Sequence, residues 1–172
     1  MKRSFADLNA QEALHVAIFI EERNAEIYHR FAEMFTEFRD PESAQIASVF
    51  WEMAAEERRH SSMLQTRYSE QYGNASCSLT EEDLVEFIEV PRLEDGDVFA
   101  DSHPGAKTRD HAFKVALTAE VSAQVFYAGL AARTDPGELR AIYQELAQME
   151  DGHVTFLKEK LSGDGATQRS VQ

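Results

Sequence analysis

Apolar residues recur every three or four positions along four long segments of the chain, which is the spacing of one face of an α-helix. In the first segment, residues 9–38, no glycine or proline interrupts the apolar stripe. Asn9 is followed three residues later by Glu12, the sequence of a helix capping box. The pattern therefore predicts one long helix over residues 9–38.

Two Asp-Pro pairs predict where further helices begin, because aspartate is a favoured N-cap and proline is tolerated in the first helical turn. Asp40-Pro41 predicts a second helix that runs to about Arg67. Asp135-Pro136 predicts a fourth helix that ends at Ser162-Gly163, after a third over residues 108–133. The first and second helices then form one antiparallel hairpin, and the third and fourth helices form another.

About forty residues, 68–107, connect the two hairpins, residues 9–67 and 108–162. Helices of about 26 residues are roughly 40 Å long, and about twelve extended residues span that distance. The connection can therefore cross the whole bundle, and its segment LVEFIEV predicts one short helix. One long crossover between the second and third helices is the ferritin-like arrangement. We expect an all-α, ferritin-like four-helix bundle as a single domain over residues 1–162, with a flexible tail over 163–172.

The two hairpins also read as copies of one another, a pattern that indicates internal duplication. Chance matches of Ala and Leu between helices are common, but Glu, His and Tyr at fixed offsets are harder to explain by chance. An offset of 99 pairs the first helices and an offset of 93 pairs the second helices: Val16 with Val115, Ala17 with Ala116, Glu21 with Glu120, Tyr28 with Tyr127 and Ala32 with Ala131, then Phe50 with Tyr143, Glu52 with Glu145, Ala54 with Ala147, Glu57 with Glu150, His60 with His153 and Leu64 with Leu157.

Six of the repeated residues carry metal-binding side chains. Each second helix has a Glu-x-x-His, whose spacing places both side chains on one face, and each first helix has a single glutamate on its apolar stripe. Glu21 lies 19 residues before Asp40 and Glu57 lies 17 after it, so these two are at one level. Glu120 and Glu150 each lie 15 residues from Asp135. The six candidate ligands are Glu21, Glu57, His60, Glu120, Glu150 and His153.

Four carboxylates buried together without a counter-charge are costly and would have to protonate. Two divalent cations cancel their four charges while both histidines stay neutral. Oxygen-rich ligands with one imidazole per metal suit iron or manganese, so we expect two iron ions per site, with manganese as the alternative. The opposing interpretation is a metal-free structural bundle whose Glu and His residues are simply solvated.

The chain resembles the ferritin-like di-iron carboxylate superfamily and, within it, the rubrerythrin-like proteins. Ala17-Glu21-Tyr28 and Ala116-Glu120-Tyr127 fit the pattern A-x-x-x-E-x6-Y, and the two Glu-x-x-His motifs extend the resemblance over both hairpins. The resemblance implies terminal carboxylate ligands at Glu21 and Glu120, bridging carboxylates at Glu57 and Glu150, and terminal nitrogen ligands at His60 and His153. Tyr28 and Tyr127 are close enough to hydrogen-bond around such a site, although core tyrosines fit the pattern equally well.

The chain also departs from that family. Rubrerythrins carry an extra carboxylate one turn after the third-helix glutamate, where this chain has Ala123. Their rubredoxin module needs four cysteines, and this sequence contains only Cys77. The six-residue set is closer to the symmetric site of bacterioferritin. A metal-bound histidine usually donates its free N–H to an acceptor, for which Glu56 is suited, whereas its counterpart Met149 is not.

Charge and hydropathy limit the classes of molecule with which the chain is expected to interact. The chain has 17 basic against 31 acidic side chains and a net charge of −14, which disfavours nucleic acid and anionic membranes. No stretch approaches 18 consecutive apolar residues, so we expect a cytoplasmic protein that is not in a membrane.

The function that these features favour is an oxidoreductase. We expect it to reduce peroxide or O2 with electrons from Fe(II) or from an external donor, and to act as a homodimer. A ferroxidase or iron-storage subunit is the alternative, in which Fe(II) itself is the substrate.

Overall fold

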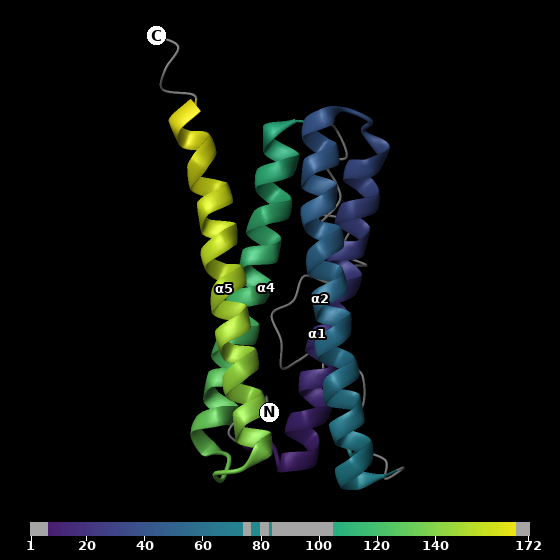
Figure 1. Ribbon diagram of the computed structural model, residues 1–172, viewed down its shortest axis with the longest axis vertical. Helices are drawn as coiled ribbons and strands as arrows, with labels where there is room; N and C mark the ends of the chain where they lie inside the picture. The colour runs from purple at the N-terminus through teal and green to yellow at the C-terminus, as the bar shows by residue number, and fades with distance from the viewer. Residues whose placement is uncertain (1–6, 74–76, 80–82, 84–104, 168–172) are drawn as a thin grey trace.

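The computed structural model describes residues 7–73, 77–79, 83 and 105–167. These residues form the helices α1 (Ala10–Glu37), α2 (Pro41–Tyr72), α4 (Ala106–Arg133) and α5 (Glu138–Thr167), and no strand occurs among them. Helix α1 packs along α2 and α4 packs along α5, so that two hairpins lie side by side (Figure 1). The predicted all-α four-helix bundle is confirmed.

Local signals in the sequence explain where α1 and α2 begin. The Asn9 side chain accepts a hydrogen bond from the Glu12 backbone N–H at 2.9 Å, and the Glu12 carboxylate accepts one from the Asn9 N–H at 3.0 Å. Asp40 accepts from the Ser43 N–H at 2.9 Å, with Pro41 in the first turn. Both caps satisfy backbone donors that have no partner inside the helix.

Two helices run further than the sequence predicts. Helix α2 continues five residues beyond Arg67 to Tyr72, and α5 continues past Ser162 to Thr167, so residues 163–167 are helical and do not belong to the expected tail. A glycine lowers helix stability by only about 1 kcal/mol relative to alanine, so Gly163 does not end α5. The expected short helix over residues 84–90 and the tail residues 168–172 lie outside the described residues.

The direction of each helix fixes the connectivity. Figure 1 shows α2 ending at the end of the bundle where α1 begins, whereas α4 begins at the opposite end. The segment from residue 73 to residue 105 therefore joins opposite ends of the bundle, and α2 and α4 run in the same direction. This is the long crossover that the length of the connection predicted.

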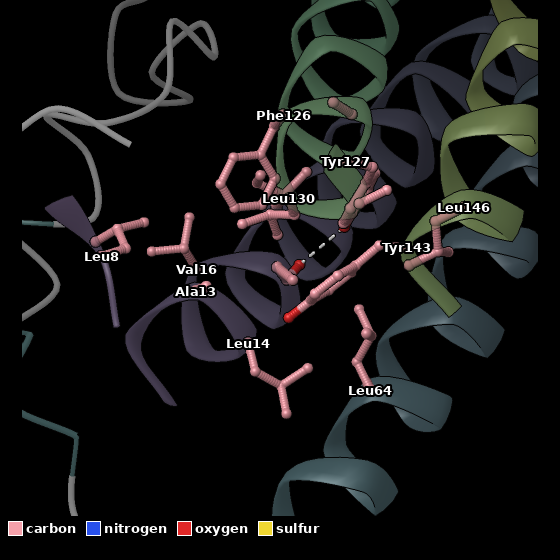
Figure 2. Packing of buried hydrophobic residues seen from close by; sticks show 14 of the residues in the cluster. Leu8, Ala13, Leu14, Val16, Leu64, Phe126, Tyr127, Leu130, Tyr143 and Leu146 are labelled. Atoms are coloured by element: carbon pink, nitrogen blue, oxygen red, sulfur yellow. Dashed lines mark hydrogen bonds between the residues drawn. The ribbon is translucent and has the colours of Figure 1, made fainter. Parts of the chain in front are cut away.

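The apolar core is divided into two clusters. The tyrosine cluster gathers around Leu14, Tyr127 and Tyr143 (Figure 2), and the phenylalanine cluster gathers around Tyr28 and Phe50. None of the six candidate ligands belongs to either cluster, although four of them are fully buried. The bundle thus contains a polar layer in its middle, enclosed by apolar side chains toward both ends.

By length and composition alone, α4 is apolar enough to cross a bilayer, with a mean hydropathy of 1.3 over 18 residues. Half of that window is buried within the bundle, and the helix carries the fully buried carboxylate of Glu120. The apolar residues of α4 therefore contribute to the core on one side, while Val121 and Val125 remain exposed on the other.

Candidate metal centre

The structure brings all six candidate ligands together in the polar layer, from four different helices. The four glutamates have no exposed surface, His60 is 4% exposed, and the side chain of His153 is 15% exposed. Glu21 comes from α1, Glu57 and His60 from α2, Glu120 from α4, and Glu150 and His153 from α5.

The ligand atoms form two overlapping groups, and within each group they lie within 4.8 Å of one another. Glu57 and Glu150 belong to both groups. The first group adds Glu21 and His60, and the second adds Glu120 and His153. Each group could hold a metal ion, and Glu57 and Glu150 are the residues common to both.

Both histidines turn Nδ1 toward the carboxylates. Nδ1 of His60 lies 3.1 Å from Oε2 of Glu21 and 3.3 Å from Oε2 of Glu57. Nδ1 of His153 lies 3.5 Å from an oxygen of Glu57 and 3.5 Å from an oxygen of Glu120. Each imidazole therefore offers Nδ1 to the cluster and keeps Nε2 for a hydrogen bond outside it.

Glu56 provides that outer hydrogen bond for only one of the two histidines. Its carboxylate lies 2.9 Å from Nε2 of His153, so α2 orients a ring that belongs to the other hairpin. Nε2 of His60 is buried and has no hydrogen-bond partner among the described residues. The expected acceptor role of Glu56 thus falls on His153, and its counterpart Met149 is 38% exposed.

Two fully buried tyrosines hold carboxylates across the hairpins. Tyr28 donates a hydrogen bond to Oε1 of Glu120 at 2.5 Å, and Tyr127 donates one to Oε1 of Glu21. Each tyrosine thus binds the glutamate of the opposite hairpin, although it lies two turns from a glutamate on its own helix. These two bonds tie α1 to α4 at the level of the cluster.

Comparison with known families agrees with this geometry. Residues 12–95 match the family model Rubrerythrin, over just under half of the chain and including Glu21, Glu57 and His60. Over these residues the chain is similar to rubrerythrins, which is consistent with a protein of the ferritin-like superfamily. Searches of curated proteins and of solved structures gave no match. The second hairpin lies beyond the match, so its part in the cluster rests on the repeat and on the structure.

Asn24 is a buried polar residue beside the candidate ligand Glu21 in the sequence of α1, and sequence reasoning missed it. It follows Glu21 by one turn on α1, is 1% exposed, and has no hydrogen-bond partner for either side-chain polar atom among the described residues. The offset of 99 pairs it with Ala123, where rubrerythrins carry the extra carboxylate. The available signal was a polar residue on the same inward stripe as Ala17, Glu21 and Tyr28.

Burial sets the charge state of the cluster in the absence of metal. Desolvation raises the pKa of Glu57 and of Glu150 well above the usual value, and the neighbouring carboxylates, Glu120 foremost, add to both shifts. Desolvation also acts to raise the pKa of Glu120, but Glu150 and His153 beside it outweigh burial and lower it.

His153 responds to the same carboxylates. Burial alone would lower its pKa, but Glu120 and Glu150 outweigh burial and raise it to about 11. Without metal, the cluster therefore retains protons. A bound cation would displace these protons.

Several buried atoms of the cluster have no hydrogen-bond partner among the described residues, which destabilises a fold unless another ligand satisfies them. They are oxygen and nitrogen atoms, the donor set that suits iron or manganese. All of them come from residues of the two overlapping groups, so the residues present fit a pair of cations. Besides Nε2 of His60, they are Oε1 of Glu57, Oε2 of Glu120, both carboxylate oxygens of Glu150 and Nδ1 of His153.

Proposed function

We propose that the chain holds two iron ions between its hairpins and acts as an oxidoreductase that reduces peroxide or O2. The electrons come from Fe(II) or from an external donor. The observation that carries this proposal is the pair of overlapping groups that share Glu57 and Glu150. A solvated bundle has no reason to bury four carboxylates at one level.

Different residues would hold the two metal ions. Glu21 and His60 would hold one ion, Glu120 and His153 the other, and the two shared glutamates both. When bound, the metal pair supplies one-electron steps and a Lewis-acid centre for a small oxidant.

The surrounding residues position these ligands and limit the access of water. Tyr28 and Tyr127 fix one oxygen each of Glu120 and Glu21, and the apolar clusters on both sides exclude water. His153 is the most exposed of the six candidate ligands. We therefore expect a small oxidant to reach the cluster past His153, near Glu56.

The experiment that tests the proposed reaction compares oxidants. Protein loaded anaerobically with Fe(II) to the capacity of the two groups is mixed with hydrogen peroxide or with O2, and iron oxidation is followed by absorbance. An oxidoreductase is expected to show faster oxidation by peroxide than by O2, and repeated turnover when a reductant is supplied. Absence of turnover with any reductant would contradict this function.

A ferroxidase or storage subunit is the second candidate, and the buried Ala123 favours it. This residue leaves the cluster without the extra carboxylate of rubrerythrins. A store is expected to take up iron far beyond two per chain in a large assembly, whereas the oxidoreductase is expected to be a homodimer. Molecular mass measured during iron loading distinguishes the two.

A further inference from the structure

Asn24 is a buried amide that nothing in the described part of the chain satisfies. The residue is 1% exposed, and neither its amide oxygen nor its amide nitrogen has a hydrogen-bond partner among the described residues. A buried polar group without a partner destabilises the fold unless a ligand satisfies it. The oxygen of an amide accepts hydrogen bonds and its nitrogen donates them. A ligand that satisfies both atoms therefore has to donate one hydrogen bond and accept another.

The position of Asn24 on α1 places it beside the candidate metal centre. It follows Glu21 by three residues and precedes Tyr28 by four, and residues at these spacings are neighbours on one helix face. Glu21 accepts a hydrogen bond from Tyr127 of α4. Tyr28 donates one to Glu120 of α4 at 2.5 Å. Both neighbours therefore reach from α1 across to α4, and Asn24 lies between them on the face that they turn toward the centre.

The residue at the same level on α4 is Ala123. Helices α1 and α4 run in opposite directions (Figure 1), so the two hydrogen bonds that join them define a midpoint on each helix. This midpoint falls beside Asn24 on α1 and beside Ala123 on α4, the two residues that the offset of 99 also pairs. Ala123 is 1% exposed. Packing alone therefore requires no amide here, because a methyl group fills the equivalent buried position of the other hairpin.

The side of the centre that α1 and α4 form differs from the side that α2 and α5 form. The two glutamates common to both groups, Glu57 and Glu150, come from α2 and α5. Helices α1 and α4 contribute one glutamate each, and each of these belongs to a single group. The α1 and α4 side therefore carries no glutamate shared between the groups. A small ligand that contacts both metal ions is expected to bind on this side, where Asn24 lies.

We propose that the amide of Asn24 binds hydrogen peroxide on the α1 and α4 side of the candidate metal centre and makes peroxide the preferred oxidant. This inference rests on the proposed function, since it assigns the oxidant of that same site. Hydrogen peroxide donates through its O–H groups and accepts through its oxygen lone pairs, so it satisfies both atoms of the amide. O2 has no hydrogen to donate and leaves the amide oxygen unpaired. A site built to form hydrogen bonds rejects a ligand that cannot form them.

The reduction of the bound peroxide balances without any change in Asn24. Hydrogen peroxide takes up two electrons and two protons, its O–O bond breaks, and two water molecules form. The electrons come from the two Fe(II) ions of the proposed function, one from each, and the protons come from solvent. The amide positions the substrate through two hydrogen bonds and takes part in no bond that forms or breaks.

The first test measures peroxide binding without turnover. The full chain is loaded with Zn(II), a divalent cation without redox chemistry, and titrated with hydrogen peroxide by isothermal titration calorimetry. Asn24→Leu keeps the branched shape of the side chain and replaces both polar atoms with methyl groups. We expect this variant to bind peroxide about tenfold more weakly, a loss of about 1.4 kcal/mol. Its metal content is expected to be unchanged and its melting temperature equal or higher, because two unsatisfied buried atoms are removed.

Rates of iron oxidation provide the second test. In Fe(II)-loaded protein, Asn24→Leu is expected to slow oxidation by dilute peroxide by the same factor and to leave oxidation by O2 unchanged. Asn24→Ala, which reproduces the residue of the other hairpin, is expected to have the same effect. Gln124→Leu is the matched control, because it removes an amide from a partly exposed position of α4 at the same level, and it is expected to behave as wild type.

The outcomes separate this proposal from the function on which it rests. If Asn24→Leu retains the peroxide affinity and the oxidation rates of the wild type, the amide holds only water, and the proposal is overturned while the proposed function stands. Loss of metal from Asn24→Leu would also overturn the proposal, since the amide would then be a metal ligand. A wild type that binds neither zinc nor iron would overturn both.

Discussion

Glu56 shows how much a single residue outside the cluster contributes to it. Its carboxylate lies 2.9 Å from Nε2 of His153, on the far side of the ring from the ligand atom Nδ1. A carboxylate in this position fixes the tautomer and the ring orientation and makes Nδ1 a better donor to a cation. His60 has no such support among the described residues. Metal affinity at the His153 position should therefore depend on a residue outside the cluster, whereas affinity at the His60 position should not depend on Glu56.

The first prediction follows from this asymmetry. Glu56→Ala is expected to weaken metal binding at the His153 position by about 10–100-fold, the effect typical of losing such a carboxylate. Competition titration with a chromophoric chelator measures the affinity. Met149→Ala, at the equivalent position of the other hairpin, is the control and is expected to leave both affinities unchanged. Equal affinities in wild type and Glu56→Ala would contradict the role of Glu56 in orienting His153.

The residues of the cluster could be predicted from sequence to different extents. Glu57 and His60 lie three residues apart on one helix face, so spacing alone identifies them. The pairing of Glu56 with His153 could not be predicted, because it depends on how one hairpin packs against the other. The position of Asn24 on the stripe of Ala17, Glu21 and Tyr28 predicts that it is buried, but a neutral asparagine outside the repeated Glu and His motifs does not indicate a metal ligand.

At the scale of the helices, the beginnings of α1 and α2 were predicted more accurately than the ends of α2 and α5. Capping side chains define the first residue of α1 and α2, and the structure confirms both caps. The end of α5 was predicted too early, because Gly163 weakens a helix without breaking it. The turn after Asp135 was predicted too tightly, because α5 begins at Glu138 and not directly after Pro136.

The second prediction concerns the capping box of α1. Asn9→Ala is expected to lower the free energy of unfolding by about 1 kcal/mol, because the Glu12 N–H loses its acceptor. Urea unfolding followed by circular dichroism measures it. Asn9→Ser retains a capping oxygen and is expected to remain within a few tenths of a kcal/mol of wild type. A loss as large in Asn9→Ser as in Asn9→Ala would show that capping is not the cause.

At the scale of the whole molecule, the fold surrounds a polar layer that is stable without metal only if it retains protons. Glu57 and Glu150 have raised pKa values in the fold, and the pKa of His153 is raised to about 11. The folded chain therefore binds more protons than the unfolded chain across neutral pH. Because the folded chain binds more protons than the unfolded chain, the free energy of unfolding falls as the pH rises across neutral pH.

The third prediction is the pH dependence that results. A carboxyl group whose pKa is raised in the fold stabilises the fold fully at pH values below its unfolded pKa near 4.5. A histidine whose pKa is raised does so at pH values below about 6.5. Both contributions to stability are lost as the pH rises further. Metal-free protein in chelator is therefore expected to melt at a lower temperature at pH 9 than at pH 6. Added Fe(II) or Mn(II) is expected to raise the melting temperature most at the higher pH, because metal displaces the protons. A melting temperature that rises with pH in chelator would contradict the protonation of Glu57, Glu150 and His153 in the metal-free fold.

The central claim is that six residues from four helices form one centre for two metal ions. The most direct test is the iron content of protein loaded anaerobically with Fe(II) and freed of excess metal. The two groups predict close to two irons per chain in the wild type. Because Glu57 and Glu150 belong to both groups, Glu57→Ala and Glu150→Ala are each expected to lose both ions. Glu52→Ala, an exposed position on α2, is expected to keep them. Iron retained at two per chain in either cluster variant would contradict the account, as would a wild type that binds none.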